Sequence, residues 1–240
     1  MIRYIRDRFK KIFAEATLFS LEVFILLGVF TAALLAFIFI AGMVFHGNTH
    51  AFDANAFNFI SGHISNVHTS IMRFFTFLGT HIFLIPANLL LTAWFLFIKK
   101  RRWNSIRIPA VALSSLLLMF ILKLIFHRER PLTPLLAAAK GYSFPSGHAL
   151  MSVTFYGLLI LIVWQSTKPL WVKWPLSITL LSLIIVIGVS RVYLRVHYAS
   201  DVLAGFSIGL MWLLFSLWIL SGIEKYSNRN IVVKEELKNP

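Results

Sequence analysis

The sequence predicts an all-α integral membrane protein: a bundle of six transmembrane helices, with an N-terminal amphipathic helix and a short amphipathic helix on the outer face. Three observations support this fold class. Hydrophobic residues make up 58% of the 240 residues, and the mean hydropathy of +0.79 is far above that of soluble domains. Six apolar segments approach the length of a membrane span. Basic residues flank these segments, so membrane topology rather than nucleic acid explains the net charge of +14.

Residues 1–22 come first in the chain. Apolar side chains recur there at helical spacing among Arg and Lys, at Ile2, Ile5, Phe9 and Ile12. This pattern predicts an amphipathic helix lying on the cytoplasmic leaflet. A frayed, charged terminus is the alternative.

The six predicted spans follow. They are Val23–Phe45, Phe74–Ile98, Ile108–Phe126, His148–Trp164, Pro175–Leu194 and Val202–Ile223. The first would measure about 34 Å as a helix, enough to cross a bilayer. The fourth and fifth need polar residues to complete their length. No domain boundary is evident, so we expect one membrane-embedded domain over 1–240, with 224–240 as a cytoplasmic tail.

The connection 46–73 is the longest hydrophilic stretch between spans. Its apolar positions follow a 3-4-3-4 spacing, at Phe57, Ile60, Ile64, Val67 and Ile71. This spacing predicts an amphipathic helix parallel to the outer surface. In the last span, Gly205 and Gly209 form a GxxxG pattern, which predicts close packing within the bundle or dimerisation.

The distribution of Lys and Arg predicts the orientation in the membrane. An even number of spans places both termini on one side, and that side carries roughly twice as many basic residues as the other. The positive-inside rule makes it cytoplasmic. We therefore expect a multi-pass protein of the cell (inner) membrane, whose third-to-fourth and fifth-to-sixth connections face the periplasm or the extracellular space.

Three polar stretches lie at span ends on that outer side: Lys123–Pro131, Phe144–His148 and Ser190–Asp201. Lys123 and Arg130 are seven residues apart, two helical turns, so both can point into one pocket. Arg191 adds a third cation. Guanidinium groups match phosphate oxygens in bidentate fashion, and Lys supplies a point charge. A lone Lys near a span end could instead anchor the helix by snorkelling.

The turn Pro145-Ser146-Gly147-His148 opens the fourth span. Free backbone N–H groups at a helix start attract anions. Gly147 permits close approach of the backbone, Ser146 adds a hydroxyl donor, and His148 is placed to protonate a leaving oxygen. A plain helix cap with a surface histidine is the alternative.

His197 and Asp201 have the i, i+4 spacing that puts two side chains on one helix face. A carboxylate that accepts a hydrogen bond from one imidazole nitrogen leaves the other nitrogen free to attack. The same pair could be purely structural. His127 and Arg128 could contact substrate or only lipid headgroups.

Taken together, the stretches read K-x6-R-P, P-S-G-H and S-R-x5-H-x3-D, with every specified position matched. This pattern and the six-span layout resemble the type 2 phosphatidic acid phosphatase superfamily, over about residues 20–223. The resemblance implies that His197 is a nucleophile forming phosphohistidine, that Asp201 orients it, and that His148 is the general acid and then the base. It also implies a phosphate-binding set, which comprises Lys123, Arg130, Ser146, Gly147 and Arg191.

The residues themselves also argue against a metal site. The outward-facing acids are only Asp53, Glu129 and Asp201, too few for a two-metal phosphatase. There is no cysteine, and the outer-connection histidines have weak ligand spacing; they are His46, His50, His63 and His68. We therefore expect neither a metal nor another cofactor.

The predicted function is metal-independent hydrolysis of a terminal phosphate on a membrane lipid phosphate or diphosphate. Undecaprenyl diphosphate, phosphatidic acid and phosphatidylglycerophosphate all fit. The alternatives are a phosphotransferase that uses the same site and a non-catalytic protein that binds anionic lipid. The expected partners are the lipid substrate and the bilayer, not nucleic acid; the sequence leaves the oligomeric state open.

Overall fold

The computed structural model describes the backbone of residues 2–131, 134–135 and 141–236, and the side chains of 23–131, 134–135 and 141–229. Regular structure in these residues is helical throughout. The elements are α1 (Ile2–Phe45), α2 (His50–Ser61), α3 (Asn66–Leu78), α4 (His81–Ala93), the π-helical turn η1 (Trp94–Ile98), α5 (Arg102–Phe126), α6 (Gly147–Trp164), α7 (Leu170–Tyr193) and α8 (Ala199–Glu236).

Six segments are long and apolar enough to cross a membrane. They are Val23–Phe45, His81–Ile98, Arg102–Phe126, Gly147–Trp164, Leu170–Tyr193 and Ala199–Arg229. Their outward faces expose large apolar side chains such as Leu90, Leu124 and Trp218, which suit lipid contact. The predicted fold class, a multi-pass helical membrane bundle, is confirmed.

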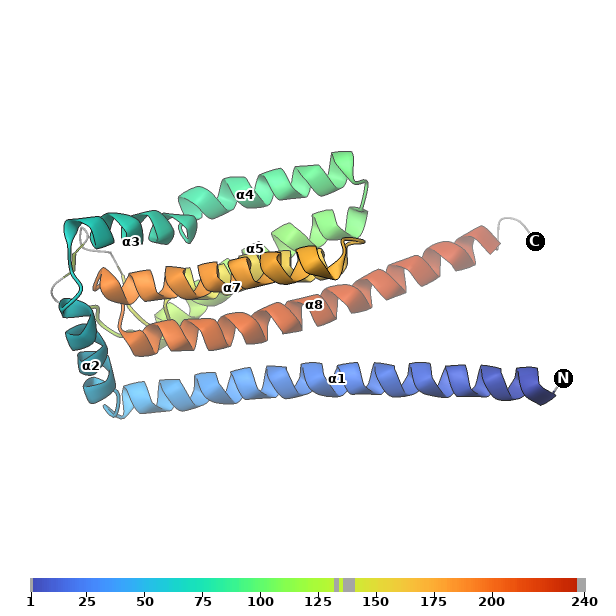
Figure 1. Ribbon diagram of the computed structural model, residues 1–240, viewed down its shortest axis with the longest axis horizontal. Helices are drawn as coiled ribbons and strands as arrows, with labels where there is room; N and C mark the ends of the chain where they lie inside the picture. The colour runs from blue at the N-terminus through green and yellow to red at the C-terminus, as the bar shows by residue number, and fades with distance from the viewer. Residues whose placement is uncertain (1, 132–133, 136–140, 237–240) are drawn as a thin grey trace.

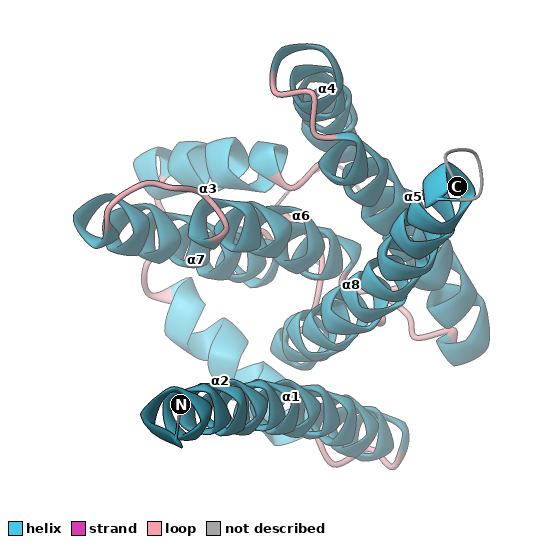
Figure 2. Cartoon of the chain, turned by 90° about the vertical axis from the view of Figure 1, so that its right-hand side faces the viewer, coloured by secondary structure: helices cyan, strands magenta, loops and turns pink. Residues whose placement is uncertain are grey.

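The helices run roughly alongside one another, and both termini lie at the same end of the bundle (Figure 1). Viewed from that end, α1 and α4 are on opposite sides (Figure 2). Between them α6 packs against α5, α7 and α8. Half of its span is buried, more than in any other span of the described chain. The helix that begins with the Ser-Gly-His turn is therefore the centre of the core.

Two glycines set the distance between α6 and α8. A Cβ atom on Gly205 would lie 2.7 Å from the carbonyl oxygen of Ser146, and one on Gly209 would lie 2.9 Å from that of Leu150. Distances this short exclude any larger residue unless a helix moves. The GxxxG pattern therefore serves close packing within the bundle, as is common for small residues in membrane helices.

The N-terminal prediction is wrong in one respect. Residues 2–22 are helical, but they continue α1 without a break and form no separate helix on the leaflet. Neither a proline nor a capping break interrupts the run from Ile2 to Phe45. At 1.5 Å per residue, α1 measures about 66 Å, roughly twice the thickness of the hydrocarbon core.

The outer connection also differs from the prediction. In place of one helix from Phe57 to Ile71, the chain forms two, separated by residues 62–65. The break comes where Ser65 caps α3 by accepting a hydrogen bond from the His68 backbone N–H at 3.1 Å. Only α2 crosses the end of the bundle, while α3 folds back beside α7 (Figure 1).

The second span starts later than predicted. Phe74 belongs to α3, which ends at Leu78, and α4 begins at His81 after a cap by the Thr80 side chain. At the junction, a Cβ atom on Gly79 would lie 2.7 Å from Ile187 and 3.2 Å from His148. The break between α3 and α4 therefore brings the backbone at Gly79 close to the start of α6. Other spans run longer than predicted: α5 and α7 begin earlier, and α8 continues to Glu236.

Candidate active site

The three motif stretches meet at the end of the bundle opposite the termini, where α2 lies (Figure 1). Lys123 is in the last turn of α5, Arg191 in the last turn of α7, and Asp201 in the first turn of α8. Backbone hydrogen bonds join the stretches directly. The Ser143 N–H donates to the Arg128 carbonyl at 2.7 Å, and the Ser146 N–H donates to the Asp201 carbonyl at 3.0 Å.

His197 is the central side chain, with 2% of its surface exposed. Its Nδ1 lies 3.5 Å from Asp201 Oδ2 and 3.3 Å from Ser143 Oγ. The fully buried Asp201 carboxylate also accepts hydrogen bonds from the Ser143 hydroxyl and from the Tyr198 N–H, the latter at 2.9 Å. The predicted His–Asp pair is thus formed, with Ser143 as an additional contact of both members.

The other ring nitrogen of His197 faces cations. Arg130 lies with NH1 3.3 Å from Nε2 and donates to the Val196 carbonyl at 2.7 Å. A guanidinium has no acceptor, so Nε2 is the acceptor and the proton sits on Nδ1, toward Asp201. This tautomer leaves the lone pair of Nε2 directed into the cationic cluster, as required of a nucleophile.

Burial sets the charge state of His197. It lowers the pKa of the imidazole to about 3, although the hydrogen bond and charge of Asp201 pull it upward, while Arg191 and Arg130 lower it further. The ring is therefore neutral near pH 7. A neutral imidazole retains the lone pair needed to attack phosphorus.

Arg130 and Arg191 both act electrostatically on His197, and Lys123 interacts with both of these arginines. Lys123 donates through Nζ to the Tyr142 carbonyl at 2.6 Å and interacts electrostatically with both arginines and with Asp201. It therefore points into the site and does not snorkel toward headgroups. Arg191 is 5% exposed and donates to Thr76 Oγ1 at 2.5 Å. Asp201 is a carboxylate that interacts electrostatically with both Lys123 and Arg130.

The turn before α6 is not a plain helix cap. Ser146 stands at the N-cap position, but its side chain makes no capping hydrogen bond. Its Oγ, Nε2 of His148 and Nε of Arg191 are buried polar atoms without a hydrogen-bond partner among the described residues. Such atoms are costly to bury unless something satisfies them. His148 interacts electrostatically with Arg191, His197 and Arg130, so it belongs to the same cluster.

Gly147 lies against the Met119 side chain of α5. A Cβ atom there would crowd the Met119 sulfur, so the methionine would have to move for any larger residue. The first turn of α6 therefore packs directly on α5, in which Lys123 occupies the last turn. All eight residues predicted for the site come from segments that meet at this one place.

Sequence reasoning missed several polar side chains around the site. They are Ser143, Thr76, Asp53, Arg128 and Ser200. The sequence places Asp53 only among the outward-facing acids and leaves Arg128 to contact either substrate or lipid headgroups. The signal that could have found Asp53 is its apolar setting, because a carboxylate in a short amphipathic helix of a membrane protein needs a partner.

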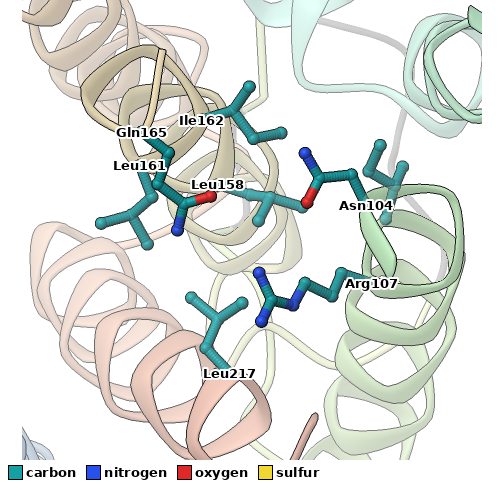
Figure 3. A pocket seen from close by; sticks show the side chains of 8 residues that line it. Asn104, Arg107, Leu158, Leu161, Ile162, Gln165 and Leu217 are labelled. Carbon is teal, nitrogen blue, oxygen red and sulfur yellow. The ribbon is translucent and has the colours of Figure 1, made fainter. Parts of the chain in front are cut away.

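Among residues with described side chains, no group of three or more His, Asp or Glu is arranged to hold a metal ion. In the outer connection, His63 and His68 each direct Nδ1 at a backbone carbonyl, at 2.9 and 2.8 Å. A separate pocket lies at the opposite end of the bundle, between α5, α6 and α8 (Figure 3). Its volume of about 20 Å³ admits one or two water molecules.

Comparisons with known proteins identify similar proteins of known activity. The chain is 33% identical over 143 residues to phosphatidylglycerophosphatase B of Bacillus subtilis (strain 168), spanning 59% of this chain and 70% of that protein. Its fold matches the crystal structure of a transmembrane PAP2 type phosphatidylglycerolphosphate phosphatase from Bacillus subtilis with a TM-score of 0.73 and 25% identity, covering 82% of this chain and 96% of that one.

A second solved structure, Aquifex aeolicus LpxE, matches with a TM-score of 0.55 and 25% identity, covering 68% of this chain and 93% of that one. The sequence model of the PAP2 superfamily matches residues 105–224, the part that carries all three motif stretches. The chain therefore belongs to the PAP2 superfamily.

Proposed function

We propose that this protein is a metal-independent lipid phosphate phosphatase that works through a phosphohistidine intermediate at His197. The observation that carries the proposal is the set of three unpartnered buried atoms, Ser146 Oγ, His148 Nε2 and Arg191 Nε, beside a neutral imidazole. These donors match the oxygens of a phosphate group. A protein that only bound anionic lipid would need the cations but not the His–Asp pair.

The first step transfers the phosphoryl group to the enzyme. Nε2 of His197 attacks phosphorus, and the bond between phosphorus and the lipid oxygen breaks. His148 donates its proton to that leaving oxygen. Lys123, Arg130 and Arg191 neutralise charge on the equatorial oxygens, together with Ser146 and the N–H groups at the start of α6.

The second step restores the enzyme. His148, now neutral, takes a proton from water, and the water oxygen attacks phosphorus. The bond between phosphorus and Nε2 breaks, inorganic phosphate leaves, and His197 returns to its neutral form. Asp201 holds the Nδ1 proton throughout and stabilises the positive charge that the ring develops.

The location of the site supports a lipid substrate. The motif residues lie at span ends, so a phosphate can reach the polar cluster while its acyl or prenyl chains stay in the bilayer. Two of the similar proteins named above are phosphatidylglycerophosphate phosphatases, which makes phosphatidylglycerophosphate the first substrate to test. Phosphatidic acid and undecaprenyl diphosphate complete the panel.

The test is phosphate release by purified protein in detergent with each lipid, in EDTA and with added vanadate. We expect release without an added acceptor, no loss in EDTA, and inhibition by vanadate as an analogue of pentacoordinate phosphorus. Activity that EDTA abolished and zinc or magnesium restored would overturn the mechanism. Release that required an alcohol acceptor would favour the phosphotransferase.

The proposed orientation, with the site outside the cytoplasm, can be tested by labelling. The chain has no cysteine, so single cysteines can be introduced at two exposed positions, Asn58 in α2 and Lys168 between α6 and α7. An impermeant thiol reagent should label Asn58→Cys in intact cells and Lys168→Cys only after lysis. The opposite pattern would place the site in the cytoplasm.

A further inference from the structure

We propose that Arg128 is a positioning residue of the active site that acts on His197 through Asp201, and that Asp53 of α2 holds it in place. The inference rests on the proposed function. It gives α2, a helix outside the three motifs, a direct part in setting the geometry of the reaction.

Both terminal nitrogens of the Arg128 guanidinium donate hydrogen bonds to protein groups. NH1 donates to Asp201 Oδ1 at 2.5 Å and to Ser200 Oγ at 2.8 Å. NH2 donates to Asp53 Oδ2 at 2.8 Å. The guanidinium lies 4.1 Å from the ring centre of Tyr198, a cation–π contact. These contacts direct Arg128 toward the back of the Asp201 carboxylate, away from Nε2 of His197.

Asp53 is buried in spite of its charge, with 3% exposed. Besides Arg128, its carboxylate accepts hydrogen bonds from the Ser200 N–H at 2.9 Å and the Ser200 hydroxyl at 2.8 Å. Ser200 directly precedes Asp201. Asp53 therefore fixes both the arginine and the backbone that carries the catalytic carboxylate.

The two oxygens of Asp201 have separate tasks in this arrangement. Oδ1 is held by Arg128, while Oδ2 faces His197, Ser143 and the Tyr198 N–H. Holding Oδ1 prevents rotation of the carboxylate away from the imidazole. The guanidinium also takes up part of the negative charge, which limits how strongly Asp201 favours a protonated His197.

Other charged groups surround this chain of contacts. His197 also faces Arg191 of α7, Arg130, and His148 of α6. Two further charged groups lie near these contacts: Lys123 of α5, which interacts with Asp201, and Glu129, which interacts with Tyr198. A substitution at Arg128 leaves all of these groups in place. Its effect therefore measures what the positive charge at Oδ1 of Asp201 contributes.

The test compares Arg128→Met, Arg128→Lys and Arg130→Met in purified protein with a lipid phosphate that the wild type hydrolyses. We expect Arg128→Met to lower kcat roughly 10- to 100-fold, the range for losing a group that orients a reacting residue. KM and the inhibition constant of vanadate should stay within about twofold because Arg128 does not contact phosphate. Arg130→Met should weaken vanadate binding at least tenfold. Vanadate binding that was lost equally in Arg128→Met would make Arg128 a phosphate ligand and overturn the inference.

The pH profile adds a readout that a purely structural role would not move. Without the guanidinium, the full charge of Asp201 stabilises the imidazolium and raises the pKa of His197. Protonation then begins at higher pH, so the acid limb of kcat/KM should shift upward in Arg128→Met and return in Arg128→Lys. An acid limb that stayed in place, with kcat lowered, would reduce Arg128 to a structural role.

A pocket of about 360 Å³ permits a rescue experiment. It opens beside Arg128 and is also lined by Asp53, Phe57 and Tyr198. Guanidinium added to Arg128→Ala should enter the space left by the side chain and raise kcat at least fivefold. The same addition should not rescue Arg130→Ala to that extent, if rescue depends on this pocket. Rescue of neither variant, or of both equally, counts against the inference.

Asp53→Asn covers the case in which the Arg128 variants do not fold. It should lower kcat less than Arg128→Met does, because Arg128 keeps Asp201, and it too should leave vanadate inhibition unchanged. Normal kcat in a folded Asp53→Asn would remove α2 from the mechanism. If the wild type hydrolysed no lipid phosphate, the proposed function would fail, and NMR titration of His197 in Arg128→Met would still decide the inference.

Discussion

The two ends of the bundle each contain a buried or half-buried arginine on a membrane helix. Only one of these ends carries the proposed active site. Arg107 of α5, near the termini, donates to Glu224 at 2.5 Å and to Ser221 at 3.3 Å, beside the small pocket of Figure 3. Arg191, at the other end, donates to Thr76 and makes no direct bond to a carboxylate among the described residues. In the part of the chain that the structure describes, neither arginine has a partner for Nε.

An unpartnered arginine nitrogen therefore does not identify a site by itself. The difference is in the charge balance: Arg107 is paired with one carboxylate, whereas Arg191 interacts electrostatically with two further cations, Lys123 and Arg130. Excess positive charge in a buried place is unfavourable without an anion. Cations in excess of acids are the feature that marks the end where we propose that phosphate binds.

The largest expected effect separates catalytic from ordinary histidines. His197→Ala should lower kcat at least about 10⁴-fold, because no nucleophile remains to accept the phosphoryl group. His63→Ala, an exposed histidine at the same end of the bundle, should stay within about twofold. Phosphate release by both variants measures the contrast. Near-normal turnover in His197→Ala would refute the assigned nucleophile.

The next effect concerns His148 and depends on the leaving group. His148→Ala should be slowed roughly 10²- to 10⁴-fold with an alkyl phosphate, because the leaving alkoxide departs unprotonated. An aryl phosphate, whose leaving group is a weaker base, should recover part of the first step. Acid quenching after mixing should then trap phosphohistidine, since water activation also needs His148. Equal losses with both substrates would assign the acid elsewhere.

Substitution of the two arginines sharpens the comparison of the ends. Arg191→Met should lower kcat/KM roughly 100-fold through lost charge stabilisation. Arg107→Met should leave kcat/KM within about twofold and lower the free energy of unfolding by about 1–2 kcal/mol, as for a partly buried ion pair. Kinetics and thermal unfolding in the same detergent give both quantities. If Arg107→Met lost activity as Arg191→Met does, the two ends would not differ as described.

The smallest expected effect is in the pH profile of the wild type. Because burial lowers the pKa of His197, the imidazole stays neutral well below the ordinary histidine value near 6.5. Protonation of the nucleophile should therefore not reduce kcat/KM between pH 7 and pH 5. NMR titration of His197 can confirm the assignment. A nucleophile titrating at or above pH 6.5 would show that Asp201 outweighs burial.

Much of the fold followed from the sequence because lipid imposes simple rules. Runs of apolar residues of span length mark the six crossings, and their even number places both termini at one end. Helix breaks were less predictable: α3 and α4 separate at Gly79 and Thr80 within a continuous apolar run. The position of this break is set by the capping side chain of Thr80 and by the packing of Gly79 against Ile187. A hydropathy profile contains neither of these interactions.

The residues of the site likewise include some that the sequence could predict and some that it could not. The eight motif residues could be predicted because they occur in fixed spacing at span ends. Ser143, Thr76 and Asp53 could not, because each is a single polar residue whose partner lies far away in the chain. Asp53 is 75 residues from Arg128. Only the path of α2 across the bundle end brings the two together.

The glycine contacts between α6 and α8 have a consequence for the precision of the site. Gly205 abuts the carbonyl of Ser146, and the Ser146 N–H donates to the Asp201 carbonyl, so the turn that opens α6 and the carboxylate of Asp201 share one register. A slip of one turn would displace them by about 5.4 Å. Such a slip would separate Ser146 from Asp201 and disrupt the proposed active site. The alignment of the second and third motif stretches therefore depends on the contact between α6 and α8, whose glycines take no part in the proposed reaction.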